Sequence, residues 1–198
     1  MDNNVMRNIS YGLFILTAKD GEKLNGCVTN TLQQVTTSPN IVTITVNKDN
    51  YTHDMVLKTG EFNVSILSEK AKFDTFKHFG FQTGREVDKF DDYPMKLASN
   101  GIPYITDGVN GFISGKVIES IDLGSHTLFI ADVTDGEVIS DDPSATYAYY
   151  HKNIKESPDK KASGWVCKIC GYVHPHEELP DDFICPLCKH PASDFEKL

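Results

Sequence analysis

Four of the five cysteines gather in the last fifth of the chain, within the stretch WVCKICGYVHPHEELPDDFICPLC. They form two C-x-x-C pairs, Cys167 with Cys170 and Cys185 with Cys188. Each pair can fold as a tight turn that directs both sulfurs to one side, and two such turns facing one another make a tetrahedral cage of four sulfurs. Such a cage suits Zn²⁺ or a single iron ion. The spacing therefore predicts a four-cysteine metal site, which Tyr172, Phe183 and Phe195 could cover as a small aromatic core.

The compartment decides how these cysteines are interpreted. The first residues, MDNNVMRN, lack the basic and then apolar pattern of a signal peptide, and no apolar run approaches the ~20 residues that span a bilayer. We therefore expect a cytoplasmic protein without a membrane partner. In a reducing compartment, paired C-x-x-C motifs indicate a metal site rather than disulfides. The remaining cysteine, Cys27, is predicted to be a small, free, partly buried thiol.

The charge argues against one class of partner. The formal net charge is −9, whereas a nucleic-acid-binding protein normally presents a basic face. Residues 165–198 carry six acidic residues against three lysines. This acidic tail fits docking on a basic patch of a partner protein, and an ordinary solvated acidic surface is the alternative.

A change of composition marks the domain organisation. Residues 152–164, KNIKESPDKKASG, are polar and rich in lysine, contain Pro158 and Gly164, and show no apolar periodicity. They are predicted to be a linker. The chain thus divides into a first domain over residues 1–151 and a second over residues 165–198.

The first domain is predicted to be mainly β. Runs rich in β-branched and aromatic residues cover residues 9–18, 41–46, 62–67, 112–123 and 126–139. In the second run Val42, Ile44 and Val46 share one face, and Ile41, Thr43 and Thr45 share the other, which is expected to be partly exposed to solvent. Short helices are expected over residues 52–60, 69–80 and 143–152, the first with Thr52 as N-cap and Gly60 as C-cap. Many antiparallel strands with a few peripheral helices indicate a β-barrel or sandwich.

Two polar segments interrupt the strands. Residues 25–39, NGCVTNTLQQVTTSP, offer many hydroxyl and amide groups for hydrogen bonds to a planar polar ring. Residues 47–55, NKDNYTHDM, place a lysine and hydroxyls at a helix N-terminus, which is a natural phosphate site. A polar strand edge and an ordinary capped helix are the alternatives. No G-x-G-x-x-G motif supports a Rossmann dinucleotide site.

The cysteine tail resembles rubredoxin, the one-iron electron carrier. The resemblance rests on CKICGYVH and LPDDFICPLC, with the features C-x-x-C-G-Y, DDF and C-P-x-C. The spacer between the pairs is shorter than in free-standing rubredoxins and is similar to the rubredoxin-like tail of rubrerythrins. Lys189 stands where a glycine usually follows the last cysteine. The resemblance implies one iron on the four cysteines, with zinc possible in recombinant protein and a zinc ribbon as the alternative.

Residues 8–152 resemble the flavin reductase-like family of FMN-binding split β-barrels. The resemblance rests on the polar N-T segment and on SPNIVTITVNKDNYTHDMV, EFNVSIL, FGFQTGREVDKF and GSHTLFIADV. It implies that six residues line the isoalloxazine ring: Thr29, Asn30, Thr31, Leu32, Gln34 and Val35. It implies that five more hold the ribityl chain and phosphate: Asn47, Lys48, Asn50, Tyr51 and Thr52.

The same resemblance implies catalytic roles for two residues. Arg85 lies in a loop that reaches the flavin or the nicotinamide donor, and His126 aligns with a histidine near the reducing face. Tyr150 and His151 would close the pocket. A structural role is the alternative for His126.

As a whole, the chain resembles the fused flavin reductase–rubredoxin proteins. This implies an oxidoreductase that takes hydride from NAD(P)H onto FMN and passes single electrons through its own iron to a redox partner such as a flavodiiron protein. It also implies a homodimer. Two alternatives stay open: a plain flavin reductase with a structural zinc tail, and a partner-binding module that carries a zinc ribbon.

Overall fold

The chain forms two compact units, residues 1–154 and 155–198, which are described separately. The computed structural model describes residue 5 and residues 8–155, 164–168, 172–186 and 190–198. The final turn of the first unit, η2 (Tyr150–Ile154), continues past residue 151 into the segment predicted as a linker. Within the described residues, no helix is long and apolar enough to cross a membrane.

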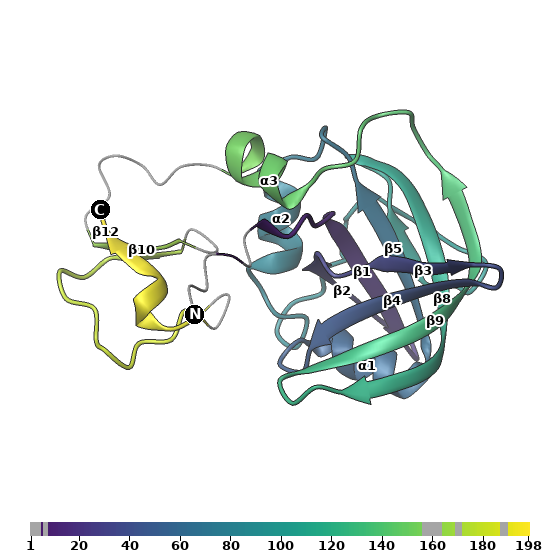
Figure 1. Ribbon diagram of the computed structural model, residues 1–198, viewed down its shortest axis with the longest axis horizontal. Coiled ribbons are helices and arrows are strands. Elements are labelled where there is room, and N and C mark those ends of the chain that lie inside the picture. Colours follow the sequence, from purple (N-terminus) through teal and green to yellow (C-terminus); the bar gives the residue numbers. More distant parts are fainter. Residues whose placement is uncertain (1–4, 6–7, 156–163, 169–171, 187–189) are drawn as a thin grey trace. The chain divides into compact units, whose positions relative to one another are not determined.

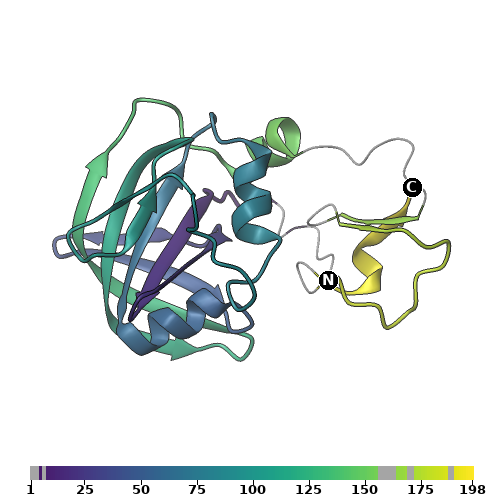
Figure 2. The same cartoon turned by 180° about the vertical axis from the view of Figure 1, so that it is seen from behind.

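An antiparallel sheet curves around the core of the first unit (Figures 1 and 2). Its strand order is β2-β1-β5-β8-β9-β4-β3. The strands are β1 (Phe14–Asp20), β2 (Lys23–Thr29), β3 (Gln33–Thr37), β4 (Asn40–Asn47), β5 (Glu61–Leu67), β8 (Val109–Asp122) and β9 (His126–Val138). Every neighbouring pair in this sheet runs antiparallel, as the sequence predicts. A second, two-stranded sheet pairs β6 (Met95–Leu97) with β7 (Pro103–Ile105).

Short helices lie at the periphery of the barrel (Figure 2). They are α1 (Tyr51–Thr59), α2 (Phe73–Gly80) and α3 (Tyr147–Tyr149), the last of which leads into η2. The predicted N-cap of α1 is wrong. Asn50 caps the helix, because its side chain accepts a hydrogen bond from the backbone N–H of Thr52. Gly60 ends the helix with a φ of 72°, as predicted from its freedom to adopt the left-handed region.

Two hydrophobic clusters form the core of this unit. The first lies inside the barrel and includes Val42, Ile44 and Val46, so the predicted inward face of β4 is confirmed. The second lies between the barrel and α2 and includes Phe76, Phe79 and Tyr150. Burial of these side chains provides most of the driving force for folding.

The second unit contains a three-stranded antiparallel sheet with the order β11-β10-β12. Its strands are β10 (Trp165–Cys167), β11 (Val173–His174) and β12 (Phe195–Lys197), and a single turn, η3 (Ala192–Asp194), precedes the last of them. The backbone N–H of Leu198 donates to the carbonyl of Gly164 over 2.9 Å. The residue before β10 and the residue after β12 are therefore hydrogen-bonded to each other.

Phe62 provides a direct test of the core. Its ring is fully buried and packs over Gly115, its cross-strand partner on β8. We expect Phe62→Ala to lower the free energy of unfolding by about 3–5 kcal/mol, because it removes buried surface and leaves a cavity. Val138→Ala is the control, since Val138 is 78% exposed, and it should change stability by less than about 0.5 kcal/mol. Equal effects of the two variants in urea denaturation would contradict this description of the core.

Candidate functional site

The pairing of β4 with β9 brings two predicted site residues together. Asn47 at the end of β4 lies opposite His126 at the start of β9. The backbone N–H of Lys48 donates to the carbonyl of Ser125, whose hydroxyl lies 2.9 Å from Nδ1 of His126. Lys48 Nζ also donates to Asp122 over 2.6 Å, and this hydrogen bond holds the pKa of Asp122 below its ordinary value. The predicted phosphate segment and the predicted catalytic histidine therefore meet at one sheet end.

Threonine hydroxyls tie the polar segment after β2 to the sheet. Thr31 Oγ1 donates to the carbonyl of Thr45 over 2.6 Å and accepts from the Thr45 N–H over 3.1 Å. The hydroxyl of Thr29 lies 3.0 Å from that of Thr31. Asn30 and Leu32 are half-buried beside them, and Leu32 packs against the first core cluster. Four of the residues predicted to line a ring thus lie in one connected segment.

The N-terminal end of α1 collects residues from distant parts of the chain. The half-buried ring of Tyr51 has the Arg85 guanidinium 4.7 Å from its centroid, and Lys23 Nζ lies 5.0 Å from the same centroid. Thr52 is fully buried, and its hydroxyl accepts a hydrogen bond from Asn25 Nδ2 over 3.0 Å. Two predicted site residues, Arg85 and Tyr51, thus lie in contact, whereas the buried Thr52 hydroxyl is already hydrogen-bonded to Asn25.

A chain of polar contacts leads from Arg85 into the protein. Arg85 Nη2 donates to Asp54 over 2.6 Å, and His53 Nδ1 donates to the other oxygen of Asp54 over 3.1 Å. His53 is buried, and its Nε2 lies 2.8 Å from Thr127 Oγ1, next to His126. Burial raises the pKa of Asp54, but the hydrogen bonds and charges of His53 and Arg85 outweigh it, so this pKa lies below its ordinary value. Sequence reasoning gave His53 no role, because its burial and its two partners become visible only in the fold.

The remaining residues of the prediction have other surroundings. Gln34 Nε2 donates to Asn40 Oδ1 within the β3–β4 hairpin, and Val35 is exposed on β3. Tyr150 is buried in the second core cluster, with its ring centroid 4.4 Å from that of Phe76, and His151 is exposed beside it. Contact between these residues and a flavin stays a prediction.

Lys89 is a buried cation that sequence reasoning missed. It is 2% exposed, and its Nζ donates to the carbonyls of Gly26 and Phe79 over 2.8 and 2.9 Å. Burial lowers the pKa of Lys89 to about 8. Cys27 is a free thiol, as predicted, but it is fully rather than partly buried, and burial raises its pKa above the ordinary value of a thiol. In the sequence, nothing distinguishes this lysine from its exposed counterparts.

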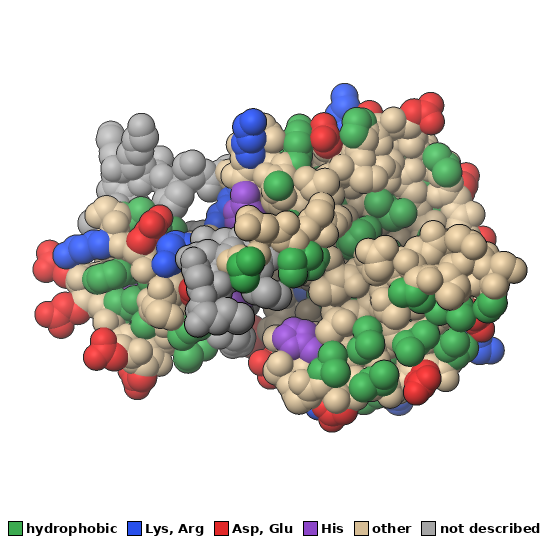
Figure 3. Space-filling view, in the orientation of Figure 1, with side chains coloured by type: hydrophobic (Ala, Val, Ile, Leu, Met, Phe, Trp, Pro, Cys, Tyr) green, Lys and Arg blue, Asp and Glu red, His purple; other side chains and the backbone are tan. Residues whose placement is uncertain are grey.

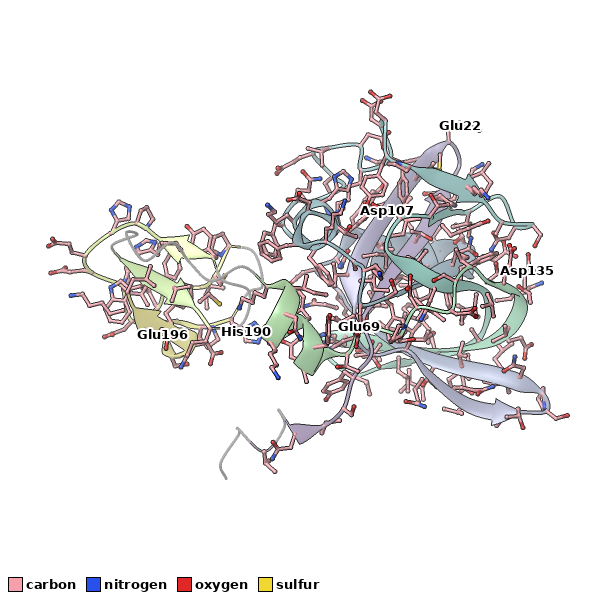
Figure 4. The ribbon with its side chains drawn as sticks, turned by 90° about the horizontal axis from the view of Figure 1, so that it is seen from above. Glu22, Glu69, Asp107, Asp135, His190 and Glu196 are labelled. Carbon is pink, nitrogen blue, oxygen red and sulfur yellow. The ribbon has the colours of Figure 1, made fainter. Side chains whose placement is uncertain are left out.

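In the second unit, both cysteine pairs begin with the same backbone arrangement. The N–H of Cys167 donates to the carbonyl of Tyr172, and the N–H of Cys185 donates to the carbonyl of His190, each over 2.8 Å. Figure 4 labels His190 in the segment that follows the second pair. In both cases the acceptor residue follows the cysteine by five positions, and both cysteines are fully buried. Cys170 and Cys188 lie outside the described residues, so the predicted four-sulfur cage stays a prediction.

The predicted aromatic core of this unit is present. The ring of Phe195 lies edge-on to those of Phe183 and Tyr172, with centroids 5.4 and 6.5 Å apart. His174 adds a tilted contact to Phe183, with centroids 4.5 Å apart. So small a core supplies little stability, and a metal would add what is missing.

Two families match the two units. Residues 6–158 match the family described as the flavin reductase like domain. The chain belongs to the flavin reductase-like family. Residues 165–196 match the rubrerythrin, rubredoxin-like domain. The predicted combination of a flavin reductase-like enzyme domain with a C-terminal rubredoxin-like domain is therefore confirmed.

Relatives and solved structures agree with this assignment. A high molecular weight rubredoxin from Moorella thermoacetica is 32% identical over the whole of both chains. A ferric-chelate reductase (NAD(P)H) from Archaeoglobus fulgidus is 36% identical over 82% of this chain and 96% of its own. The NADH:FAD oxidoreductase SgcE6 of Streptomyces globisporus C-1027 shares the fold, with a TM-score of 0.66 and 24% identity over 72% of this chain and 84% of its own. The predicted fold class, a mainly β flavin reductase barrel with a rubredoxin-like domain, is confirmed.

The residues at both sites fit the groups that these families imply. The half-buried hydroxyl and amide groups of Thr29, Asn30, Thr31, Asn47 and Asn50 can hydrogen-bond a polar ring and its side chain. Lys48 and Arg85 supply positive charge beside a helix N-terminus. Buried cysteines at the start of each C-x-x-C pair provide soft sulfur donors, which suit iron or zinc.

The buried amine of Lys89 makes stability depend on pH. Between pH 8 and 10.5 the unfolded chain keeps a proton that the folded chain has released, so the free energy of unfolding rises with pH. Above pH 9 the Cys27 thiol acts in the opposite direction, because its raised pKa lets the folded state keep a proton that the unfolded state loses. From pH 8 to 9 we expect a rise of about 1 kcal/mol in urea denaturation.

Two variants check the origin of this rise. Lys89→Met should abolish it, whereas Lys58→Met should keep it, because the Lys58 side chain is exposed and paired with Asp20. An unchanged rise in Lys89→Met would assign the effect to another group.

Proposed function

We propose that the chain takes hydride from NAD(P)H onto FMN and passes electrons singly to an iron ion in its own four-cysteine site. The observation that carries this proposal is the union of a flavin reductase-like domain and a rubredoxin-like domain in one chain. When bound, a flavin accepts electron pairs and releases single electrons, and an iron ion held by four cysteines carries one electron at a time. The protein would supply binding, orientation and exclusion of water.

Each part of FMN would contact a different set of residues in the first unit. Residues 29–32, together with Gln34 and Val35, would line the ring, and Thr31 would orient this segment because its hydroxyl is fixed to β4. Asn47, Lys48 and Asn50 would hold the ribityl chain and phosphate, with the first amides of α1. Thr52 would contribute through its backbone and through packing, since its hydroxyl is held by Asn25.

Two side chains would act on the reaction itself. Arg85 would bind an anionic group at the start of α1, where it already lies over Tyr51. His126 is half-buried opposite Asn47 and would face the flavin from the end of β9. An imidazole there can donate a hydrogen bond to a carbonyl oxygen of the ligand and so orient the nicotinamide ring of NAD(P)H. The proposal names FMN rather than FAD as the flavin, and either NADH or NADPH as the hydride donor.

In the second unit, Cys170 and Cys188 would complete the iron site begun by Cys167 and Cys185. The acceptor beyond this iron would be a redox protein such as a flavodiiron protein. Acidic residues at 177, 178, 181 and 182 are exposed and would favour a basic docking surface on that partner.

The first unit would pair with a second copy of the chain. Ile121, Leu128 and Ile41 belong to strands β8, β9 and β4, and the strand registers place them on the outward face of the sheet. Ile121 is 41% exposed, and Val35 on the adjoining β3 is 50% exposed. Figure 3 shows hydrophobic side chains gathered over this part of the molecule. A homodimer would cover this face.

The electron route can be tested in purified protein from a native host. We expect anaerobic NADH or NADPH to bleach the flavin band and the ferric iron–sulfur band together. Cys185→Ser should lose the iron band and keep flavin reduction, because Cys185 lies in the second unit. Persistence of the ferric band while the flavin bleaches would contradict the relay. A yellow protein containing zinc would instead indicate a plain flavin reductase, and a colourless one a binding module.

The homodimer can be tested by sedimentation equilibrium. The wild-type protein should have twice the 22.1 kDa mass of the chain. Ile121→Glu should shift the protein toward the monomer, because a buried unpaired carboxylate at an interface is costly. Leu57→Glu is the control, since Leu57 is equally apolar and 56% exposed on α1, and it should remain dimeric. A monomeric wild-type protein would contradict the proposal.

A further inference from the structure

The loop at residues 81–94 joins α2 to β6 and carries Arg85. All four residues from 85 to 88 are exposed, so the loop has little apolar burial of its own there. Arg85 nevertheless occupies a defined place, with its guanidinium over Tyr51 and a 2.6 Å ion pair to Asp54. An exposed ion pair stabilises a conformation only weakly. Something else must fix this loop.

Lys89 is the polar attachment of the loop, beside the apolar one made by Phe90, which is buried in the second core cluster. Its Nζ donates to the carbonyl of Gly26 on β2 and to the carbonyl of Phe79 on α2. Its own carbonyl accepts a hydrogen bond from His78 Nε2 over 2.6 Å. One residue therefore joins three segments: the loop, a barrel strand and the helix before the loop.

The chemistry of Lys89 is unusual for a purely structural residue. A buried ammonium group normally has a carboxylate partner, because burial of a charge is costly. Among the residues that the structure describes, no carboxylate forms an ion pair with Lys89, and its two acceptors are backbone carbonyls. An apolar side chain would fill this space without the cost of burying a charge. What the amine adds is its two hydrogen bonds, which connect the loop to β2 and α2.

Gly84 provides a second attachment one residue before Arg85. It is buried against Asn25, and a Cβ atom at this position would lie 2.1 Å from Asn25 Oδ1. Asn25 in turn donates to Thr52 on α1. The loop can approach the barrel this closely only because residue 84 has no side chain. Arg85 is thus bracketed by Gly84 on one side and Lys89 on the other.

We propose that Lys89 is a positioning residue that clamps this loop to β2 and α2 and thereby holds Arg85 at the start of α1 to bind the phosphate group of the flavin. The inference rests on the proposed function, which assigns that phosphate to residues 47–52. Lys89 does not touch the ligand in this arrangement. Its effect on binding passes entirely through Arg85.

The first test needs no flavin. Trypsin cleaves after Arg85 only when the loop leaves the barrel, so the rate of cleavage reports loop opening. We expect Lys89→Met and Gly84→Ala each to raise that rate at least about fivefold in the flavin-free full chain, measured by mass spectrometry. Lys58→Met removes an equal charge from an exposed site and should leave the rate within about twofold of wild type. Unchanged cleavage in both loop variants would overturn the proposal.

The second test is a double-mutant cycle on FMN affinity, measured by flavin fluorescence. Lys89→Met should raise the Kd for FMN about tenfold, as expected for loss of a charged hydrogen bond to phosphate. In an Arg85→Gln background the same change should have less than about a twofold effect, because the residue it positions is gone. Equal weakening in both backgrounds would overturn the proposal and make Lys89 a general structural residue.

The outcomes separate this inference from the proposed function. If the wild-type chain binds no FMN, the proposed function fails, and the trypsin result still decides whether Lys89 clamps the loop. If wild type binds FMN and the cycle shows no coupling, only the role of Lys89 fails. Should Lys89→Met not fold by circular dichroism, Gly84→Ala replaces it in the cycle with the same expected coupling.

Discussion

The antiparallel register between β4 and β9 is the constraint on which the candidate site depends. It places Asn47 opposite His126 and lets Lys48 bond to the turn before β9. A shift of one residue would turn Val42, Ile44 and Val46 out of the core, so the hydrophobic interior fixes the register strongly. The geometry of the polar site is therefore inherited from the packing of apolar side chains on the opposite face. Selection for stability and selection for chemistry act here on the same two strands.

Polar side-chain contacts add to the strand register in positioning the site residues. Thr31 hydrogen-bonds through its side chain to both backbone groups of Thr45, so the irregular segment before β3 is attached to β4. At the other side of the site, the contacts from Arg85 through Asp54 and His53 reach the strand that carries His126. The loop, the helix and the strand are thus connected by side chains from three distant parts of the sequence. Such connected polar groups tend to specify a single arrangement.

The sequence predicts the fold well because its signals are local and periodic. Alternation in β4, the glycine after α1 and the C-x-x-C spacing each depend on a few neighbouring residues. The predicted N-cap is wrong because Asn50 and Thr52 are both good capping residues, and only the backbone conformation distinguishes them. Lys89 and His53 escape prediction for a different reason. Their roles arise because the fold buries them beside segments that are far away in the chain. A single lysine or histidine in the sequence indicates neither its burial nor its partners.

In the second unit, residues far apart in the sequence lie close together. The N–H of Leu198 donates to the carbonyl of Gly164, so the two ends of the segment 164–198 are adjacent in space. A segment whose ends meet can replace a surface turn in another protein without forcing the host strands apart. The rubredoxin-like unit is therefore suited to insertion into the middle of a foreign chain, at a surface turn.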